Sequence, residues 1–467
     1  MKVLLIAAPR PSTNETAMHM GDGRPPMGLA YISAYLEKFD HETKIVDLYH
    51  FGGDHESERR SPKATATICH IIQNHDPVNI FEEIEEYKPD FIGMYMGTIS
   101  YYRGTKLIDE IKKKYPDIPT MVGGPHAIEL PNTLVDHFDY VVSGEGEIAA
   151  LEIVEGKIKE KGIVKRPNVD DINELPFPDF RHFIDKPYNW ELEMFDNDIK
   201  PVITLNSTRG CPFSCMFCGV ANTKFRGIEA RSLTNYIGGL VDQYGAQGIY
   251  FREDNFTVQP KRVADFCDAL ISEGINISWA CESRVNNLSS KLIEKMAKAG
   301  CVGLYIGVES GSERMLKYMR KGENRKDFID KMPIIHANGI TTYTTWMYGL
   351  PSETKEDRDV TDRFIEELNP TTADTFVYLG VPGSDFYKIL DHTKQYEHKE
   401  KNGIIYPPGF LNLARRVYGS DDPRVEYTEM IYEENKVKAQ EVEPYYITNS
   451  VYQDLKTKKI RSQLSVK

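Results

Sequence analysis

The chain has 467 residues, 40% hydrophobic and 27% charged, which is the composition of a globular protein with two or three domains. Its formal net charge of −13 argues against nucleic acid as the main partner, because phosphate binding needs a local excess of lysine and arginine. No apolar run in the sequence reaches the roughly 20 residues that cross a bilayer, so we expect no membrane partner.

Residues 1–155 alternate short β-rich runs with helical stretches. This pattern predicts an α/β fold with a doubly wound, Rossmann-like parallel sheet. The expected strands are residues 2–8, 43–48, 90–96, 120–123 and 140–144. The expected helices are residues 27–38, 101–115 and 147–155. Ligands of such sheets bind at the carboxyl ends of the strands, where residues 97–100, 123–126 and 143–147 are small or polar.

Residues 156–195 interrupt this alternation. The run 173–179 is rich in proline and polar residues, which is typical of a linker between domains.

A second alternating pattern fills residues 196–387. Its expected strands are residues 202–207, 248–253, 277–281, 303–308, 342–348 and 375–379, with helices such as 262–273, 290–299 and 355–368 between them. Six β/α units in sequence predict a (β/α)6 partial barrel with its site at the strand carboxyl ends. Residues 388–467 have weak periodicity, and we expect a small C-terminal accessory region there.

The chain has seven cysteines, and three of them, Cys211, Cys215 and Cys218, crowd into eight residues. This distribution favours a metal site and a reducing compartment over disulfides, so a cytoplasmic location is expected. The other four cysteines, Cys69, Cys267, Cys281 and Cys301, are scattered and are expected to be buried small hydrophobic residues.

The C-x3-C-x2-C spacing of the three cysteines lies in a loop directly after a strand. Thiolates suit iron–sulfur clusters or zinc, and three of them can ligate three irons of a cubane while the fourth iron stays open. Structural zinc sites usually have four ligands, and neither a second cysteine pair nor a histidine follows here. The spacing therefore favours a [4Fe–4S] cluster over a zinc knuckle or chance clustering.

The loop resembles the signature of the radical S-adenosylmethionine (SAM) superfamily. The resemblance implies that the open iron binds the amino and carboxylate groups of SAM and that Phe217 lies by the adenine. Reductive cleavage of SAM would then give a 5′-deoxyadenosyl radical that abstracts hydrogen from a substrate.

Further residues fall where that family lines its SAM pocket, at the ends of successive strands. Glu253, Arg284, Glu309 and Ser310 are the candidates. A carboxylate such as Glu309 can bind ribose hydroxyls, and the guanidinium of Arg284 can pair with the methionine carboxylate. The run at residues 349–354 also resembles the relevant subfamily.

The front half resembles the cobalamin-binding domain of cobalamin-dependent radical SAM enzymes, through residues 24–31, 123–126, 144–147 and the linker at 174–179. The cobalamin-binding candidates at the strand ends are Thr98, Ser100, Gly123, Gly124, His126, Gly144, Glu145 and Gly146. The Asp-x-His-x-x-Gly motif that supplies a cobalt ligand in some cobalamin proteins is absent, since His55, His70 and His75 lack that context. The resemblance implies a corrin held without an axial histidine, with His126 beside it. A Rossmann module without ligand is the alternative.

The two resemblances together imply a class B-like radical SAM methyltransferase that methylates an unactivated carbon by way of the 5′-deoxyadenosyl radical and methylcobalamin. A peptide or protein substrate, such as a glutamine of methyl-coenzyme M reductase, is implied by overall resemblance alone. A cyclase or oxidoreductase on the same two domains, and a non-enzymatic cobalamin or iron–sulfur carrier, are the alternatives. The expected partner is a low-potential electron donor, a flavodoxin or ferredoxin.

Overall fold

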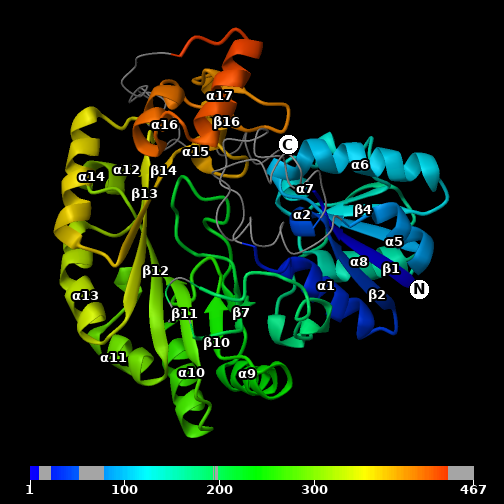
Figure 1. Cartoon of the computed structure of the whole chain (residues 1–467), viewed down its shortest axis with the longest axis horizontal. Coiled ribbons are helices and arrows are strands. Elements are labelled where there is room, and N and C mark those ends of the chain that lie inside the picture. The colour runs from blue at the N-terminus through cyan, green and yellow to red at the C-terminus, as the bar shows by residue number, and fades with distance from the viewer. Residues whose placement is uncertain (10–22, 52–77, 193, 195–197, 440–467) are drawn as a thin grey trace. The chain divides into compact units, whose positions relative to one another are not determined.

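The computed structural model describes residues 1–9, 23–51, 78–192, 194 and 198–439 and contains two six-stranded sheets (Figure 1). The chain folds into two compact units. The first is drawn from Met1–Arg209, Arg226–Phe256 and Lys261–Ala280, and the second from Gly210–Phe225, Thr257–Pro260 and the chain from Cys281 onward.

The front sheet consists of parallel strands in the order β2-β1-β3-β4-β5-β6. The strands are β1 (Lys2–Ala7), β2 (Glu42–Asp47), β3 (Phe91–Tyr95), β4 (Thr120–Gly123), β5 (Tyr140–Val142) and β6 (Gly162–Val164). From β1 the chain adds β2 on one side and then β3 to β6 on the other, so the strand order reverses between β1 and β3. The carboxyl ends of these two strands form the crevice where doubly wound folds bind ligands. The predicted Rossmann-like sheet is confirmed.

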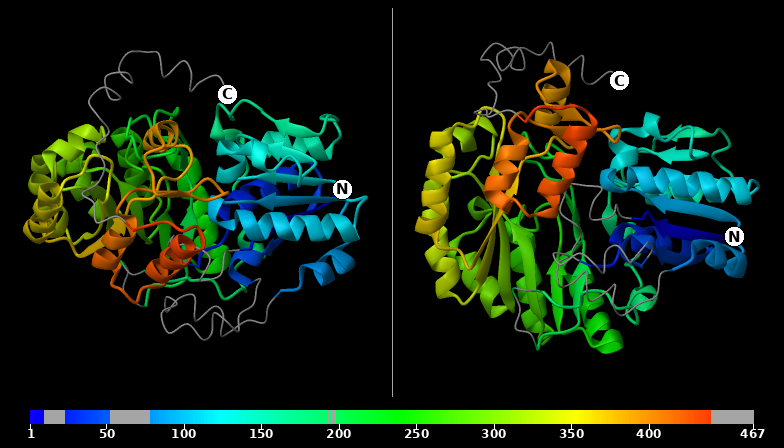
Figure 2. Two further views of the ribbon diagram at one scale, coloured as in Figure 1. Left: turned by 90° about the horizontal axis from the view of Figure 1, so that it is seen from above. Right: turned by 45° about the horizontal axis from the view of Figure 1, so that its top comes forward.

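Helices cover both faces of the front sheet (Figures 1 and 2). Helices α5 (Ile80–Tyr87) and α6 (Tyr101–Lys114) pack Ile84 and Ile108 into one core with Leu4 and Ile92 of the strands. Helices α1 (Met27–Glu37) and α8 (Gly146–Val154) pack against each other. The short helices α2 (Leu48–Phe51) and α7 (Pro125–Glu129) follow β2 and β4.

The short helices α2, α5 and α7 and the strand β6 of the front half were not predicted. Helix α5 places Ile80 and Ile84 at the spacing of one helix face, but its eight residues are fewer than the roughly 10–12 by which a helix is told from a short strand. Strand β6 falls inside the segment expected to be linker and adds a sixth strand beside β5. Three residues are too few to show the alternation that identifies a strand.

The second sheet has the order β14-β13-β12-β11-β10-β7, in which each strand neighbours the next one along the chain. The strands are β7 (Val202–Leu205), β10 (Gly248–Phe251), β11 (Ser278–Ser283), β12 (Cys301–Glu309), β13 (Thr341–Tyr348) and β14 (Thr372–Val377). All six predicted strands are present, with ends that differ by up to three residues. This sequential order confirms the predicted partial barrel.

Helices alternate with these strands and form the outer layer visible in Figure 1. They are α9 (Ala230–Tyr244), α10 (Pro260–Ser272), α11 (Ser290–Lys298), α12 (Glu313–Tyr318), α13 (Arg325–Ala337) and α14 (Lys355–Leu368). Their buried side chains interlock with the strands. For example, Phe266 of α10 lies edge-on to Trp279 of β11, with ring centroids 5.6 Å apart.

The C-terminal region is a small set of short elements. It comprises α15 (Asp385–Thr393), the antiparallel pair β15 (His398–Lys399) and β16 (Ile405–Tyr406), α16 (Phe410–Tyr418) and α17 (Pro423–Glu434). Tyr418 of α16 accepts a hydrogen bond from the Val377 N–H at 2.7 Å, which fixes this helix to the end of β14.

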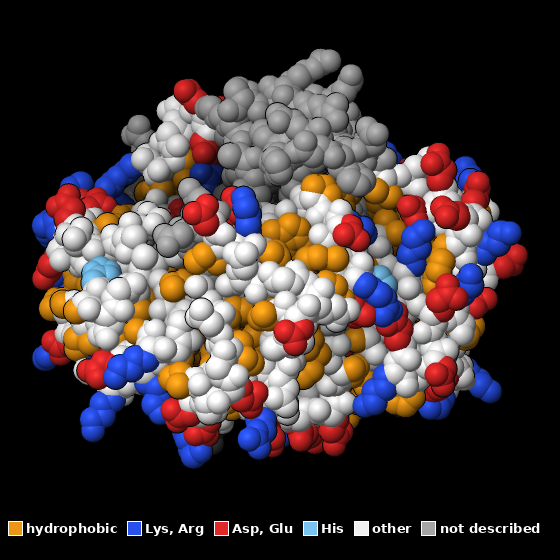
Figure 3. All heavy atoms as spheres, turned by 60° about the horizontal axis from the view of Figure 1, so that its bottom comes forward, with side chains coloured by type: hydrophobic (Ala, Val, Ile, Leu, Met, Phe, Trp, Pro, Cys, Tyr) orange, Lys and Arg blue, Asp and Glu red, His pale blue; other side chains and the backbone are white. Residues whose placement is uncertain are grey.

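Surface features agree with the composition. On the face drawn in Figure 3, lysine and arginine side chains are interspersed with aspartate and glutamate and form no basic patch. Among the described helices, none combines the length and hydropathy that a membrane span requires.

Candidate functional site

The three clustered cysteines lie on a loop that leaves a two-stranded antiparallel ribbon, β8 (Thr208–Arg209) and β9 (Arg226–Gly227). Gly210 begins the loop with φ +82°, and a Cβ there would collide with the Lys224 carbonyl, so only glycine fits. Thr223 closes the loop, since its Oγ1 accepts a hydrogen bond from the Cys211 N–H at 2.9 Å. The loop is thus a closed unit that presents its cysteines together.

All three cysteines are reduced thiols rather than halves of a disulfide. Cys211 and Cys215 are buried and Cys218 is half-buried. Among the described residues, no three His, Cys, Asp or Glu side chains converge on a single metal ion. A cubane does not require such convergence, because each thiolate binds a different iron. Three reduced thiols on one short loop therefore fit a [4Fe–4S] cluster.

Arg284 directly follows β11 and lies against the cysteine loop. Its Nη1 is 3.3 Å from the Sγ of Cys215, and its guanidinium lies 4.1 Å from the ring centroid of Phe213. The guanidinium also pairs with Glu323 at 3.2 Å and donates a hydrogen bond to the Lys321 carbonyl. The structure therefore brings Arg284 to the cysteines and already gives it acidic and carbonyl partners.

Glu309 ends β12 at an irregularity in its pairing with β13, where its φ is +72°. The carboxylate is buried, and burial raises its pKa, although Lys321 opposes this with Nζ 3.7 Å away. Lys321 also lies 3.5 Å from Glu323, so Arg284, Glu309, Lys321 and Glu323 form one buried charged network. Lys321 and Glu323 were missed by the sequence analysis, because they follow α12 in a loop that has no distinctive pattern.

Ser310 and Phe217 are placed differently. Ser310 is fully buried and shares a hydrogen bond of 3.2 Å with Thr361 of α14, so its hydroxyl faces the helix layer. Phe217 is partly buried against an apolar cluster that includes Met216, Leu350 and Tyr378.

Glu253 lies in the first unit, just after β10. Its carboxylate accepts hydrogen bonds from the Ser207 N–H and the Thr208 hydroxyl. Burial raises its pKa, and the nearby Arg262 opposes that shift. Glu253 therefore supports the strand end from which the cysteine loop starts.

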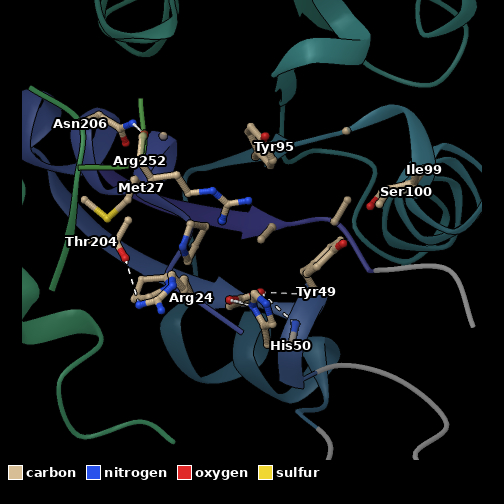
Figure 4. A pocket seen from close by; sticks show the side chains of 17 residues that line it. Arg24, Met27, Tyr49, His50, Tyr95, Ile99, Ser100, Thr204, Asn206 and Arg252 are labelled. Atoms are coloured by element: carbon tan, nitrogen blue, oxygen red, sulfur yellow. Dashed lines mark hydrogen bonds and ion pairs between the residues drawn. The ribbon is translucent and has the colours of Figure 1, made fainter. Parts of the chain in front are cut away.

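The first unit contains a cavity of about 440 Å³ at the carboxyl ends of β1, β2 and β3 (Figure 4). Of the eight predicted cobalamin-binding residues, it is lined by Ser100 alone. Arg24 also lines it and belongs to the run 24–31 that carried the resemblance, whereas the sequence analysis missed Tyr49, His50, Tyr95 and Arg252. These side chains come from four separate segments that only the sheet order brings together. They do not belong to one sequence motif.

His50 is the most informative of these side chains. Its Nδ1 is 2.8 Å from Asp47, whose carboxylate also accepts a hydrogen bond from the Tyr188 hydroxyl at 2.8 Å. Burial would raise the pKa of Asp47, but the charge and hydrogen bonds of His50 and Tyr188 outweigh it and leave the pKa lowered. The Nε2 of His50 is buried without a hydrogen-bond partner. An orphaned polar atom and an open cavity at the sheet crevice fit a large polar cofactor such as a corrin.

His126 and Thr98 lie in the interior. His126 is fully buried and hydrogen-bonded to Thr98 at 3.4 Å and Thr133 at 3.0 Å, and burial lowers its pKa to about 4. Both ring nitrogens of His126 are therefore engaged within the protein, and its expected position beside the corrin stays a prediction.

Among the remaining candidates, Gly124 and Gly146 are closely packed and Glu145 is ion-paired. A Cβ at Gly124 would meet the Met96 carbonyl at 2.8 Å, and one at Gly146 would meet Ile32 at 2.8 Å. Glu145 is held by Arg226 at 2.6 Å and by the Val169 N–H at 2.8 Å. Gly123 and Gly144, like these three, are not among the residues that line the cavity. Cobalamin contacts of these five residues stay predictions.

The scattered cysteines that the structure describes are buried as expected: Cys267 and Cys281 fully, and Cys301 to within 4%. Cys69, His55, His70 and His75 lie outside the described residues.

Comparison with family models assigns both halves of the chain. Residues 205–365 match the radical SAM superfamily, and residues 21–154 match the B12-binding domain. The chain is a cobalamin-dependent radical SAM enzyme. The enzyme therefore uses a [4Fe–4S] cluster, SAM and cobalamin, and neither the zinc knuckle nor the Rossmann module without ligand is supported.

Similar proteins include an uncharacterized methyltransferase, PH0819, of Pyrococcus horikoshii, which is 26% identical over 91% of this chain and 87% of the relative. An anaerobic magnesium-protoporphyrin IX monomethyl ester cyclase of Rubrivivax gelatinosus is 23% identical over 87% of this chain and 73% of the relative.

The solved structure of the cobalamin-dependent SAM radical enzyme OxsB with aqua-cobalamin shares the fold. Its TM-score is 0.67 and its identity 15%, over 98% of this chain and 71% of that chain. These relatives are enzymes, which argues against a non-enzymatic carrier.

Proposed function

We propose that this radical SAM enzyme transfers a methyl group to an unactivated carbon of its substrate. The observation that carries the proposal is the presence in one chain of a closed loop with three reduced thiols and a sheet-crevice cavity in a B12-binding domain. The similarity to a methyltransferase along 91% of the chain supports methyl transfer over other radical outcomes.

The cofactors supply the difficult chemistry when bound: the cluster with SAM supplies a carbon-centred radical, and cobalamin supplies the methyl group. Under the proposal, Cys211, Cys215 and Cys218 hold three irons of the cluster. Arg284 donates to the Cys215 sulfur, and the buried carboxylate of Glu309 is available for ribose hydroxyls.

In the other unit, the cavity beside His50 would hold the corrin, and Arg24 and Arg252 are two of the cationic side chains that line it. Arg24 is itself held in place, because its Nη2 donates to the Glu191 carbonyl at 2.5 Å and its guanidinium lies 5.4 Å from the Tyr250 ring centroid.

The test is anaerobic reconstitution with iron, sulfide, cobalamin and SAM that carries a deuterated methyl group. We expect 5′-deoxyadenosine together with a substrate that gains the labelled methyl. Peptides containing the glutamine of methyl-coenzyme M reductase are a first substrate panel, chosen because of the overall two-domain resemblance. A product that instead loses hydrogens or gains oxygen would favour the cyclase-type reaction of the Rubrivivax relative.

Cysteine variants test the cluster assignment directly. Alanine at Cys211, Cys215 or Cys218 should abolish iron binding and 5′-deoxyadenosine formation, because each thiolate supplies one iron ligand. Cys301→Ala is the control, since Cys301 is buried, as Cys211 and Cys215 are, but lies at the start of β12. Iron content and product that survive in all three loop variants would contradict the assignment.

A low-potential donor such as flavodoxin or ferredoxin is proposed as the electron source, since reductive SAM cleavage needs one. A cytoplasmic location is proposed because the described cysteines are all reduced thiols, as in reducing compartments.

A further inference from the structure

A second cavity, of about 180 Å³, lies in the unit that includes the chain from Cys281 onward. It is found at the carboxyl ends of β13 and β14, next to Gly349 and Val377, and its other side is formed by residues 407–410 and the start of α16. The carboxyl ends of barrel strands are where such folds build substrate sites. Its lining residues are not among those proposed to hold the cofactors.

Arg358, in the first turn of α14, supplies a buried cation to this cavity. The residue is 8% exposed, and its Nε and Nη1 have no hydrogen-bond partner. The nearest carboxylate, Glu353, lies 3.6 Å from Nη1, which is too long for a hydrogen bond, and it accepts the Gly349 N–H at 2.6 Å instead. Buried donors are rarely left unpaired in native proteins, so these N–H groups indicate a missing acceptor.

The opposite wall adds further positive character. Helix α16 begins after Gly409, which has φ +77°, and its amino-terminal turn borders the cavity, where the helix carries partial positive charge. Arg416 of the same helix also lines the cavity. Its ion pair with Asp362, at 3.0 Å, uses Nη2 and keeps the guanidinium beside the cavity.

Tyr378 connects this cavity to the cluster loop. It lines the cavity and also belongs to the apolar cluster that contains Met216 and, at its edge, Phe217. The Phe386 N–H donates to the Met216 carbonyl at 2.8 Å, so the cluster loop and the C-terminal region are joined at this point. A group bound beside Arg358 would therefore lie next to the layer that supports the third cysteine of the loop.

We infer that this cavity is an oxyanion subsite that binds a carboxylate or phosphate group of the substrate through Arg358, Arg416 and the amino terminus of α16. Its volume suits a single small anionic group. The donors from two helices would fix the orientation of the substrate, while the rest of the substrate extends toward the cluster loop. That the bound anion belongs to the substrate of methyl transfer rests on the proposed function, whereas anion binding by the cavity does not.

The experiment uses the holoenzyme with cluster and cobalamin, titrated calorimetrically with inorganic phosphate and, separately, with succinate. We expect at least one of them to bind, and Arg358→Gln to weaken that binding by about tenfold or more. Arg416→Gln, at a more exposed position, should weaken it by a smaller factor. Arg415→Gln is the matched control on the same helix, because Arg415 pairs with Glu429 and does not line the cavity.

The relative affinities for phosphate and succinate decide which anion the substrate carries. SAM is titrated in parallel, because its methionine carboxylate is the competing source of the same chemistry. Unchanged SAM affinity in Arg358→Gln supports a substrate subsite. A parallel loss of SAM affinity in Arg358→Gln would overturn the substrate subsite. It would also be overturned if neither anion bound, or if the Arg416→Gln and Arg415→Gln variants bound the anion equally well. Failure of methyl transfer with intact anion binding would count against the proposed function only.

Discussion

Arg284 illustrates how a residue can be found from sequence and still have a different set of partners. The strand-end position suggested a guanidinium for the methionine carboxylate of SAM. In the structure the same guanidinium contacts the Cys215 sulfur, the Glu323 carboxylate and the Lys321 carbonyl. Hydrogen bonds to the sulfurs of an iron–sulfur cluster stabilise its reduced state and raise its potential.

We therefore predict that Arg284→Gln lowers the reduction potential of the cluster. If the reduced cluster loses roughly 1 kcal/mol of stabilisation relative to the oxidised cluster, the reduction potential falls by about 40 mV for a one-electron couple. The measurement is a redox titration followed by electron paramagnetic resonance without SAM. Arg325→Gln, which removes a peripheral arginine paired with Glu367, should leave the potential unchanged. An unchanged potential in Arg284→Gln would show that the contact does not persist in the holoenzyme.

Glu353 is a second residue with a strong local consequence. It is buried, and burial raises its pKa to about 7 despite the Gly349 N–H and the nearby Arg358. Since the folded-state pKa lies above the ordinary value of 4.5, the folded state favours the protonated form. The stabilisation from protonated Glu353 is fully present below pH 4.5 and is lost as the pH rises through about 7. The free energy of unfolding falls by about 3 kcal/mol in total over this range.

The prediction is that the apparent Tm falls less between pH 5 and pH 8 in Glu353→Gln than in the natural enzyme. Thermal unfolding of both proteins across this range measures the difference. Glu356→Gln changes an exposed carboxylate in the same turn and should reproduce the natural pH profile. Identical profiles for Glu353→Gln and the natural protein would refute the assignment.

At the scale of elements, Asp357 joins the start of α14 to α12. Asp357 forms a capping box with Thr354, accepts the Ser312 hydroxyl at 2.5 Å and pairs with Arg314. It thereby fixes the start of α14 to α12. Helix α12 is the element that follows the end of β12, where Glu309 lies. The sequence shows the cap, since Thr354 and Asp357 have the spacing of a capping box, but it does not show the partners from α12.

Asp357→Ala should destabilise the protein by about 2–4 kcal/mol, the sum of a lost cap and two unpaired polar partners. Asp359→Ala, two residues on, removes only a surface pair with Lys355 and should cost less than about 0.5 kcal/mol. Denaturant unfolding of both variants compares them. Equal effects would mean that the cap and the α12 contacts add little.

At the scale of the whole molecule, the compact unit that contains the B12-binding domain extends beyond it in sequence. The first unit combines the front sheet with β7, β10 and α9 of the radical SAM sequence. Glu145 and Glu147 contribute to this connection, since they pair with Arg226 and Arg209 on either side of the cysteine loop. Glu145 therefore has a structural role in this unit, and its cobalamin contact stays a prediction.

We predict that Glu145→Gln lowers the free energy of unfolding by about 2–3 kcal/mol, because Arg226 would be left buried without its carboxylate. Bound cobalamin should stay equimolar in the variant, measured by absorbance after gel filtration. Glu152→Gln, which breaks the more exposed pair with Arg166, is the control for stability. Loss of cobalamin without loss of stability would instead support direct contact of Glu145 with the cofactor.

The sequence by itself determined the two α/β modules, the succession of their strands along the chain and the cysteine loop. These features are local, since hydrophobic periodicity and ligand spacing are written in contiguous residues. It also singled out Arg284 and Glu309, because strand ends of a barrel meet at one face, and their contacts with SAM stay predictions.

Only the tertiary structure decided which side chains line the cavities. Arg24, His50, Tyr95 and Arg252 come from separate segments, and Arg358 faces the start of α16 from a distant part of the chain. The structure also gave His126 and Gly146 packing contacts that their motifs do not show, since His126 is fully buried and a Cβ at Gly146 would meet Ile32. Burial and the choice of partner depend on how distant segments pack, and no local pattern specifies that packing.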